Sequence, residues 1–326
     1  MHDTVVIRDS GARWRIDLRV LLAFGAIYVL WGGTFLAIRI AVLQIPPFFT
    51  AGVRFLTAGI LLHAFMRLRG EPRLTLIEWR NTAIIGLCMF VLTYGPLFWA
   101  EQYVSSSITS VIEASLPITT ITLEVFVFRT QRNQGRALAG VLLGFFGIVL
   151  LLVNNRDQKL AVIPCLVILA AGIAWSFGAV LSGRLALPRS RPLTAGTEMM
   201  LGGAVLLALS ASTGELRPPP HVTLSAGLAL LYLIDCGSLI AYTAYVWLLA
   251  RMSATRVASH AYINPLVAVA LGYFLAGEVI TTRTVFAAAL VVGSVFLILS
   301  RGPTAGAPTA GSPAATKSAA CAMLRE

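Results

Sequence analysis

Charged side chains are scarce in this sequence of 326 residues. Asp, Glu, Lys and Arg together make up only 12%, whereas hydrophobic residues make up 57% and the mean hydropathy is +0.83. Soluble domains typically carry about 25% charged residues. The composition therefore excludes a water-soluble fold and predicts an integral membrane protein whose surroundings are the lipid bilayer.

The residues that several kinds of chemistry need are also missing. Only two lysines are present, Lys159 and Lys317, and neither ends a GxxxxGK[ST] phosphate loop, so we expect no direct use of ATP. No two acidic residues lie closer in sequence than Asp3 and Asp9, so clustered carboxylates for a magnesium ion are absent. The four cysteines form no CxxC spacing, which argues against zinc and against a disulfide framework. We expect no cofactor or metal, and an enzyme is disfavoured.

Ten apolar stretches approach the roughly 20 residues that a helix needs to cross a bilayer. They lie near residues 20–38, 48–66, 82–100, 106–128, 137–153, 160–181, 193–210, 225–248, 254–275 and 284–300. Nineteen of the 25 Arg and Lys residues fall on the side of the two termini and five on the other side. Because positive charge stays in cytoplasmic loops, both termini are predicted to be cytoplasmic. The net charge of +11 is thus a topology signal, and we expect no nucleic-acid partner.

The chain resembles itself when it is shifted by 144 or 148 residues. The pairs that then coincide are Trp31 with Trp175, Thr50-Ala51-Gly52 with Thr194-Ala195-Gly196, Arg54 with Glu198, Tyr94 with Tyr242, Trp99 with Trp247, and Pro117 with Pro265. Many secondary transporters are built from such repeats, with the solute site between them. We therefore predict an all-α integral membrane fold of ten transmembrane helices. It comprises two five-helix inverted-topology repeats at 20–156 and 157–300, a cytoplasmic segment at 1–19 and a disordered cytoplasmic tail at 301–326.

Several short motifs then become recognisable. They are Trp31-Gly-Gly-Thr-Phe-Leu-Ala-Ile-Arg39, Ala51-Gly-Val-Arg54-Phe-Leu, Asn264-Pro265 and Gly277-Glu278. Over about residues 20–300 the sequence resembles the EamA-like branch of the drug/metabolite transporter superfamily. The resemblance implies a ten-helix carrier for small metabolites, with a central cavity lined by helices one, three, four, six, eight and nine. The sequence departs from the family in lacking a Gly-Glu pair after the fourth helix, and in having Glu113 where an apolar or small residue is usual.

Charged residues inside predicted spans need an explanation, because each costs roughly 2.5 to 3.5 kcal/mol at a helix centre. Glu113 would bind a solute amine or carry a proton, or else pair with Arg54 or a buried hydroxyl. His260 coincides under the 148-residue shift with the neighbour of Glu113, so it is a candidate proton or solute contact, or else bonds a backbone carbonyl. Arg54, Glu198 and Asp235 are candidates for proton transfer, gating or structural pairing.

The paired aromatic residues Trp31, Trp175, Tyr94 and Tyr242 lie within predicted spans. They are candidates for lining the cavity and binding an apolar solute body, although ordinary core packing explains them too. Asn264 precedes Pro265, which frees a carbonyl one turn upstream, so its amide either satisfies such a carbonyl or contacts solute.

These observations together predict a secondary transporter of the cytoplasmic (inner) membrane. It would export a small amphipathic metabolite, with an amino acid or related zwitterion as the best guess, by alternating access of its two halves. The nearest alternative is proton-coupled efflux of cationic or aromatic drugs through the same carboxylate. A non-transporting scaffold or a membrane enzyme is more distant. The coupling ion and a homodimeric assembly are left open.

Overall fold

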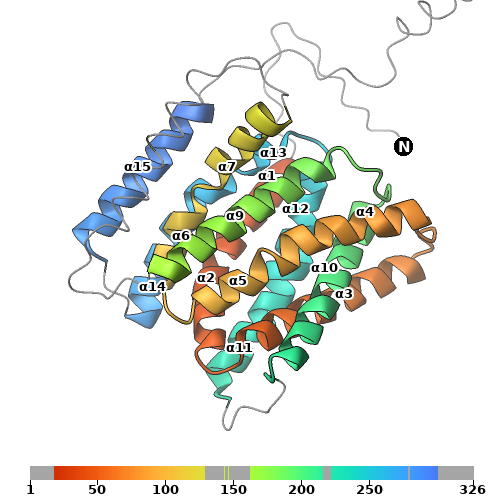
Figure 1. Ribbon diagram of the computed structural model, residues 1–326, viewed down its shortest axis with the longest axis horizontal. Coiled ribbons are helices and arrows are strands. Elements are labelled where there is room, and N and C mark those ends of the chain that lie inside the picture. The colour runs from red at the N-terminus through yellow and green to blue at the C-terminus, as the bar shows by residue number, and fades with distance from the viewer. Residues whose placement is uncertain are drawn as a thin grey trace, which may run out of the picture.

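The structure, a computed structural model, describes residues 18–128, 143, 146, 162–215, 222–277 and 280–299. These residues form helices and connecting segments without a strand, packed side by side in one bundle (Figure 1). Seven helical stretches are long and apolar enough to cross a membrane: Leu18–Val42, Pro47–Leu68, Leu76–Ala100, Ser106–Val127, Val162–Ser182, Arg191–Ser212 and Leu224–Leu249. The all-helical membrane fold is confirmed in this part of the chain.

Several spans combine α-helices with π-helices, which are labelled η. The first four spans contain α1 (Leu18–Gly25), η1 (Ala26–Leu30), α2 (Trp31–Val42), α3 (Pro47–Leu68), α4 (Leu76–Gly86), η2 (Leu87–Val91), α5 (Tyr94–Ala100), α6 (Ser106–Glu113), α7 (Leu116–Thr122) and η3 (Leu123–Val127). The later helices are α9 (Val162–Ser182), α10 (Arg191–Ser212), α11 (Leu224–Tyr232), η4 (Leu233–Ile240), α12 (Ala241–Leu249), α13 (Ala254–Val257), α14 (His260–Ala276) and α15 (Thr282–Leu299).

The predicted spans fall on these helices wherever the structure describes them, with one boundary misplaced. The spans expected at 254–275 and 284–300 fall on α13, α14 and α15. The span expected at 137–153, the N-terminal segment and the C-terminal tail lie outside the described residues, apart from Leu143, Phe146 and the last two residues of the segment. The total of ten helices and the inverted arrangement of the halves therefore stay predictions.

One predicted boundary is wrong by six residues. The third span begins at Leu76 rather than near residue 82. Thr75 and Glu78 cap this helix reciprocally: the Thr75 amide donates to Glu78 Oε2 at 2.8 Å, and the Glu78 amide donates to Thr75 Oγ1 at 3.3 Å. Such a capping box satisfies backbone donors at a helix start, so it extends the helix beyond its apolar part.

Helices α3 and α10 pack against each other along their whole length, and Figure 1 shows them side by side. Glycines let the two backbones approach closely. At Gly196, for example, an added Cβ would lie only 2.7 Å from the backbone nitrogen of His63. The contacts are Gly52 with Leu207, Leu56 with Gly203, Gly59 with Met200, and His63 with Gly196. Residue numbers rise along α3 as they fall along α10, so the two helices are antiparallel. We call this contact the glycine seam.

The glycine seam is self-complementary. A shift of 144 residues converts the Gly59–Met200 contact into the contact between Gly203 and Leu56. The same shift converts the contact of Gly52 with Leu207 into that of Gly196 with His63. Such reciprocity is the mark of a two-fold contact between equivalent surfaces. The sequence repeat is thus also a repeat of packing at this place.

Candidate solute cavity

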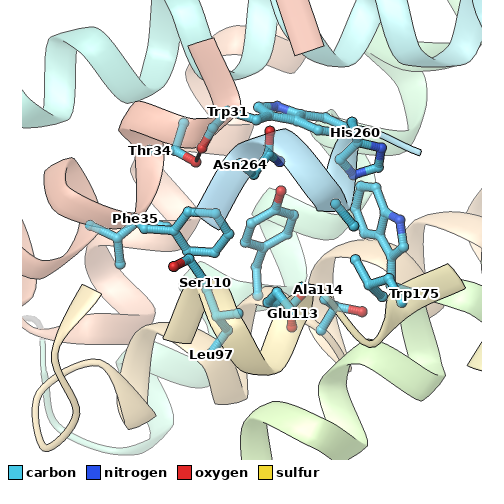
Figure 2. A pocket seen from close by; sticks show the side chains of 15 residues that line it. Trp31, Thr34, Phe35, Leu97, Ser110, Glu113, Ala114, Trp175, His260 and Asn264 are labelled. Carbon is cyan, nitrogen blue, oxygen red and sulfur yellow. Dashed lines mark hydrogen bonds between the residues drawn. The ribbon is translucent and has the colours of Figure 1, made fainter. Parts of the chain in front are cut away.

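A small cavity lies at the centre of the bundle, between α2, α5, α6, α9 and α14 (Figure 2). Its walls include Trp31, Thr34, Phe35, Thr93, Tyr94, Leu97, Ser110, Glu113, Trp175, His260 and Asn264. The water-accessible space is about 40 Å³, enough for a few water molecules. Six of the seven predicted solute-binding residues line this central cavity; Tyr242 lines a different one. Their contact with solute stays a prediction.

Glu113 is the last residue of α6 and the acidic residue of the cavity wall. Its Oε1 is buried and has no hydrogen-bond partner among the residues that the structure describes. Leaving a buried acceptor unsatisfied costs about 1 to 3 kcal/mol, and more when the group is charged. The predicted alternative, a pairing with Arg54, is not formed: Arg54 Nε donates to Ser238 Oγ at 2.9 Å. Glu113 is therefore available to a donor that enters the cavity.

His260 begins α14 on the opposite wall from Glu113, beside Asn264 (Figure 2). Its Nδ1 donates to the Val257 carbonyl at 2.8 Å, which is the structural role that the sequence left open. Its ring also contacts Trp31, with centroids 5.0 Å apart. The backbone bond fixes the orientation of the imidazole, so His260 presents its ring to the cavity in one position.

Asn264 ties α14 to the first span while it lines the cavity. When the amide is oriented with its nitrogen toward three neighbouring carbonyls, it donates to those of Tyr28 at 2.9 Å, Ile27 at 3.2 Å and His260 at 3.1 Å. Two of these carbonyls belong to η1, where π-helical geometry replaces the usual α-helical pairing. None of the three is the carbonyl of Ala261, which Pro265 frees one turn upstream, so these bonds mainly tie α14 to the neighbouring span.

Five aromatic rings contact one another in a layer, and three of them, Trp31, Tyr94 and Trp175, line the central cavity. We call Trp31, Tyr94, Trp175, Tyr242 and Tyr245 the aromatic layer. Trp175 is at its centre, with centroid distances of 5.7 Å to Trp31, 5.8 Å to Tyr94 and 5.2 Å to Tyr245. Tyr242 stacks on Tyr245 at 6.0 Å. Tyr245 was missed because the 148-residue shift places it on Leu97, so the repeat gives no signal for it.

Arg54 is fully buried behind the wall of the central cavity. Its guanidinium lies over the rings of Phe55 at 4.5 Å and Tyr94 at 5.1 Å. A Cβ on Gly237 would be 2.8 Å from Arg54 Nη2 and 2.9 Å from Thr34 Cγ2, so the guanidinium lies next to a cavity-lining residue. Arg54 Nη1 has no partner among the described residues.

The other two predicted gating residues, Asp235 and Glu198, lie in different environments. Asp235 is exposed and lines neither this cavity nor the one near Glu198. It lies in η4, whose wider turns change the phase of the helix and bring Gly237 and Ser238 inward instead. Glu198, by contrast, is buried and accepts a hydrogen bond of 2.6 Å from Tyr242 Oη at its Oε2. No pattern in the sequence indicates this pairing of Tyr242 with Glu198.

Comparison with known proteins gives the same pattern of two halves. The model of the EamA-like transporter family matches residues 18–153 and again residues 162–300. The chain is 38% identical over 290 residues to the "Uncharacterized inner membrane transporter YedA" of Escherichia coli (strain K12), covering 88% of this chain and 92% of that protein. It is 25% identical over 280 residues to the "Probable amino-acid metabolite efflux pump" of Salmonella typhimurium (strain LT2), covering 83% and 91%.

A solved structure described as "Crystal structure of protein" has the same fold. It superposes with a TM-score of 0.64 at 20% sequence identity, over 87% of this chain and 98% of that one. At this identity the likeness concerns the fold alone.

Proposed function

We propose a solute and a mechanism for this chain from the premise that it belongs to the EamA-like transporter family, whose model matches both of its halves. As a member with many apolar helices, it is a multi-pass transporter of the cytoplasmic (inner) membrane. The proposal is that it exports a small amphipathic metabolite, an amino acid or a related zwitterion, by alternating access.

The observation that carries the proposal is the buried Oε1 of Glu113 at the central cavity, which has no hydrogen-bond partner among the described residues. A solute ammonium would donate to Glu113 Oε1 and gain a charge-assisted hydrogen bond. The faces of Trp31 and Trp175 favour a cation as well, and they also accept an apolar side chain. This combination fits an amine with an apolar body.

A zwitterion is favoured over a simple amine by Arg54. Its buried guanidinium lies next to Thr34 and Tyr94, both of which line the cavity. A fixed positive charge there would repel a purely cationic drug and attract a solute carboxylate. The relative named as an amino-acid metabolite efflux pump is consistent with this choice.

Alternating access is supported by the glycine seam and by two helix interruptions. The self-complementary packing of α3 and α10 fits two inverted halves related by an axis in the membrane plane. The fourth span is interrupted after Glu113, and α14 begins at His260 after the short helix α13. Glu113 and His260 thus both lie at helix interruptions. At about 40 Å³, the central cavity must enlarge before it can hold an amino acid.

The test is release of preloaded amino acids from proteoliposomes that contain the purified chain, with and without an imposed pH gradient. Release that depends on the gradient indicates a coupled exporter, and release without it indicates a facilitator. Absence of amino-acid release from a folded preparation, together with gradient-dependent release of an aromatic cation, would replace the proposal by drug efflux.

A further inference from the structure

A second and larger cavity lies near the ends of α9, α10 and α12. Its volume is about 350 Å³, and its walls include Ser182, Leu187, Arg191, Glu198, Tyr242 and Ala250. Leu187 lies in the segment that joins α9 to α10, which the distribution of Arg and Lys predicts to be cytoplasmic. We call this the inner cavity. It is large enough for an amino acid without any rearrangement.

The inner cavity presents two opposite charges that come from one helix. Arg191 is the first residue of α10, and Glu198 lies seven residues further along it. At 1.5 Å per residue, the two positions are roughly 10 Å apart along the helix axis. Arg191 is only half-buried, whereas Glu198 is 2% exposed. The cavity therefore has a basic group near the end of the helix and an acidic group at depth.

Glu198 is held in place by Tyr242. The 2.6 Å bond from Tyr242 Oη to Glu198 Oε2 orients the carboxyl, and both side chains line the cavity. A buried carboxylate is costly, and one neutral hydrogen bond together with the charge of Arg191, roughly 10 Å away along the helix axis, offsets that cost only in part. A ligand ammonium would place a positive charge in direct contact with Glu198.

The opposite charges of Arg191 and Glu198 favour a ligand that carries both charges. A guanidinium binds a carboxylate through two parallel hydrogen bonds, and a carboxylate binds an ammonium. A zwitterion of amino-acid size, with its carboxylate toward Arg191 and its ammonium toward Glu198, would therefore bridge the two residues. An amine without a carboxylate would engage Glu198 alone, and an acid without an ammonium would be repelled at depth.

The two cavities meet at the aromatic layer. Trp175 lines the central cavity and Tyr242 lines the inner one, and their ring centroids are 6.2 Å apart. A solute that moves from the inner cavity to Glu113 would cross this contact. We infer that the inner cavity is a second solute site, which captures a zwitterion from the predicted cytoplasmic side between Arg191 and Glu198. The inference rests on the proposed function for its direction and its solute class.

The test measures occupancy of the inner cavity without requiring transport. Ala250 is an exposed residue of its wall, so an Ala250→Cys variant in a chain with its native cysteines replaced reports access. The rate of labelling by a charged maleimide is measured in detergent with leucine, with 3-methylbutylamine and with 4-methylpentanoate. Leucine should slow labelling several-fold, the amine less, and the acid not at all.

Three variants locate the protection. Glu198→Gln should abolish protection by leucine and by the amine. Arg191→Gln should reduce protection by leucine to the level seen with the amine, an effect that a merely structural role of Arg191 would not produce. Glu113→Gln, which alters the central cavity, should leave protection intact. Size-exclusion chromatography checks that each variant is folded. Arg191→Gln changes a half-buried residue at the start of α10, so it tests the site without altering the protein interior.

Each other outcome overturns the inference or separates it from the proposed function. Equal loss of protection in Glu113→Gln means one site rather than two. No protection by leucine at millimolar concentration, or protection unchanged in Glu198→Gln, removes the inner site even where leucine is released from proteoliposomes. Protection of Ala250→Cys with the expected variant pattern, but without release of amino acids from proteoliposomes, would support the inner site and contradict the export proposal.

Discussion

Trp31 and Trp175 lie 144 residues apart in the sequence and meet edge to face, with their ring centroids 5.7 Å apart. The two residues coincide when the chain is shifted onto itself, so equivalent side chains of the two halves are in direct contact. Trp31 Nε1 also donates to the Gly237 carbonyl at 2.9 Å. Contacts from both halves therefore fix the orientation of the Trp31 indole beside the central cavity.

Replacing Glu113 by Gln should reduce amino-acid release tenfold or more, which corresponds to about 1.4 kcal/mol. The substitution keeps the shape of the side chain and removes the negative charge that would bind a solute ammonium. Release from proteoliposomes measures the effect, and Glu71→Gln, in the segment between α3 and α4, is the matched control. Release that is unaltered in Glu113→Gln would remove this residue from the site.

Replacing Tyr242 by Phe should lower the free energy of unfolding by about 1 to 3 kcal/mol. The change deletes the donor of the 2.6 Å bond and leaves the buried Glu198 carboxyl with less support. Thermal unfolding in detergent measures the loss. Tyr103→Phe is the control, because Tyr103 is 56% exposed. Equal midpoints of thermal unfolding for Tyr242→Phe and Tyr103→Phe would contradict a stabilising role of the hydrogen bond between Tyr242 and Glu198.

Replacing Gly59 by Ala should destabilise the protein by about 1 to 3 kcal/mol, because the added Cβ would overlap the Met200 backbone in the glycine seam. Gly227→Ala is the matched control: nothing lies within 4 Å of a Cβ at this helical glycine. The control should be neutral or slightly stabilising, since alanine favours a helix. Thermal midpoints compare the two, and the prediction fails where Gly227→Ala is the more damaging change.

Single cysteines should reveal the orientation in the membrane. Leu43, between α2 and α3, is predicted to face the periplasm, and Arg69, after α3, is predicted to face the cytoplasm. In a chain without native cysteines, Leu43→Cys should react with an impermeant maleimide in intact cells. Arg69→Cys should react only after permeabilisation. The reverse pattern would invert the topology and place the inner cavity on the outer side.

The sequence was informative where hydrophobic length and the repeat decide the outcome. Span positions follow from the length of apolar runs, and the repeat singled out Trp31, Tyr94 and Trp175 for the cavity wall. Glu113 was found because a carboxylate is costly in a bilayer, and the structure places it on that wall.

The sequence was uninformative where contacts between distant spans determine the partner of a side chain. Arg54 bonds Ser238, and Glu198 bonds Tyr242, through packing that no local pattern encodes. Its depth in the span predicts Asp235 near the solute path, but η4 turns this residue outward. Tyr245 has a leucine as its counterpart in the repeat, so a search for matched pairs passes over it.

The π-helices η1, η2, η3 and η4 affect how variants of this chain should be chosen. A helical wheel assumes a constant angle per residue, and each π-helix breaks that assumption because its hydrogen bonds reach back five residues rather than four. A wheel drawn through a whole span would therefore assign the wrong face to positions beyond residues 26–30, 87–91 or 233–240. Scanning mutagenesis of these three spans needs two wheels each, joined at the π-helix with a new phase.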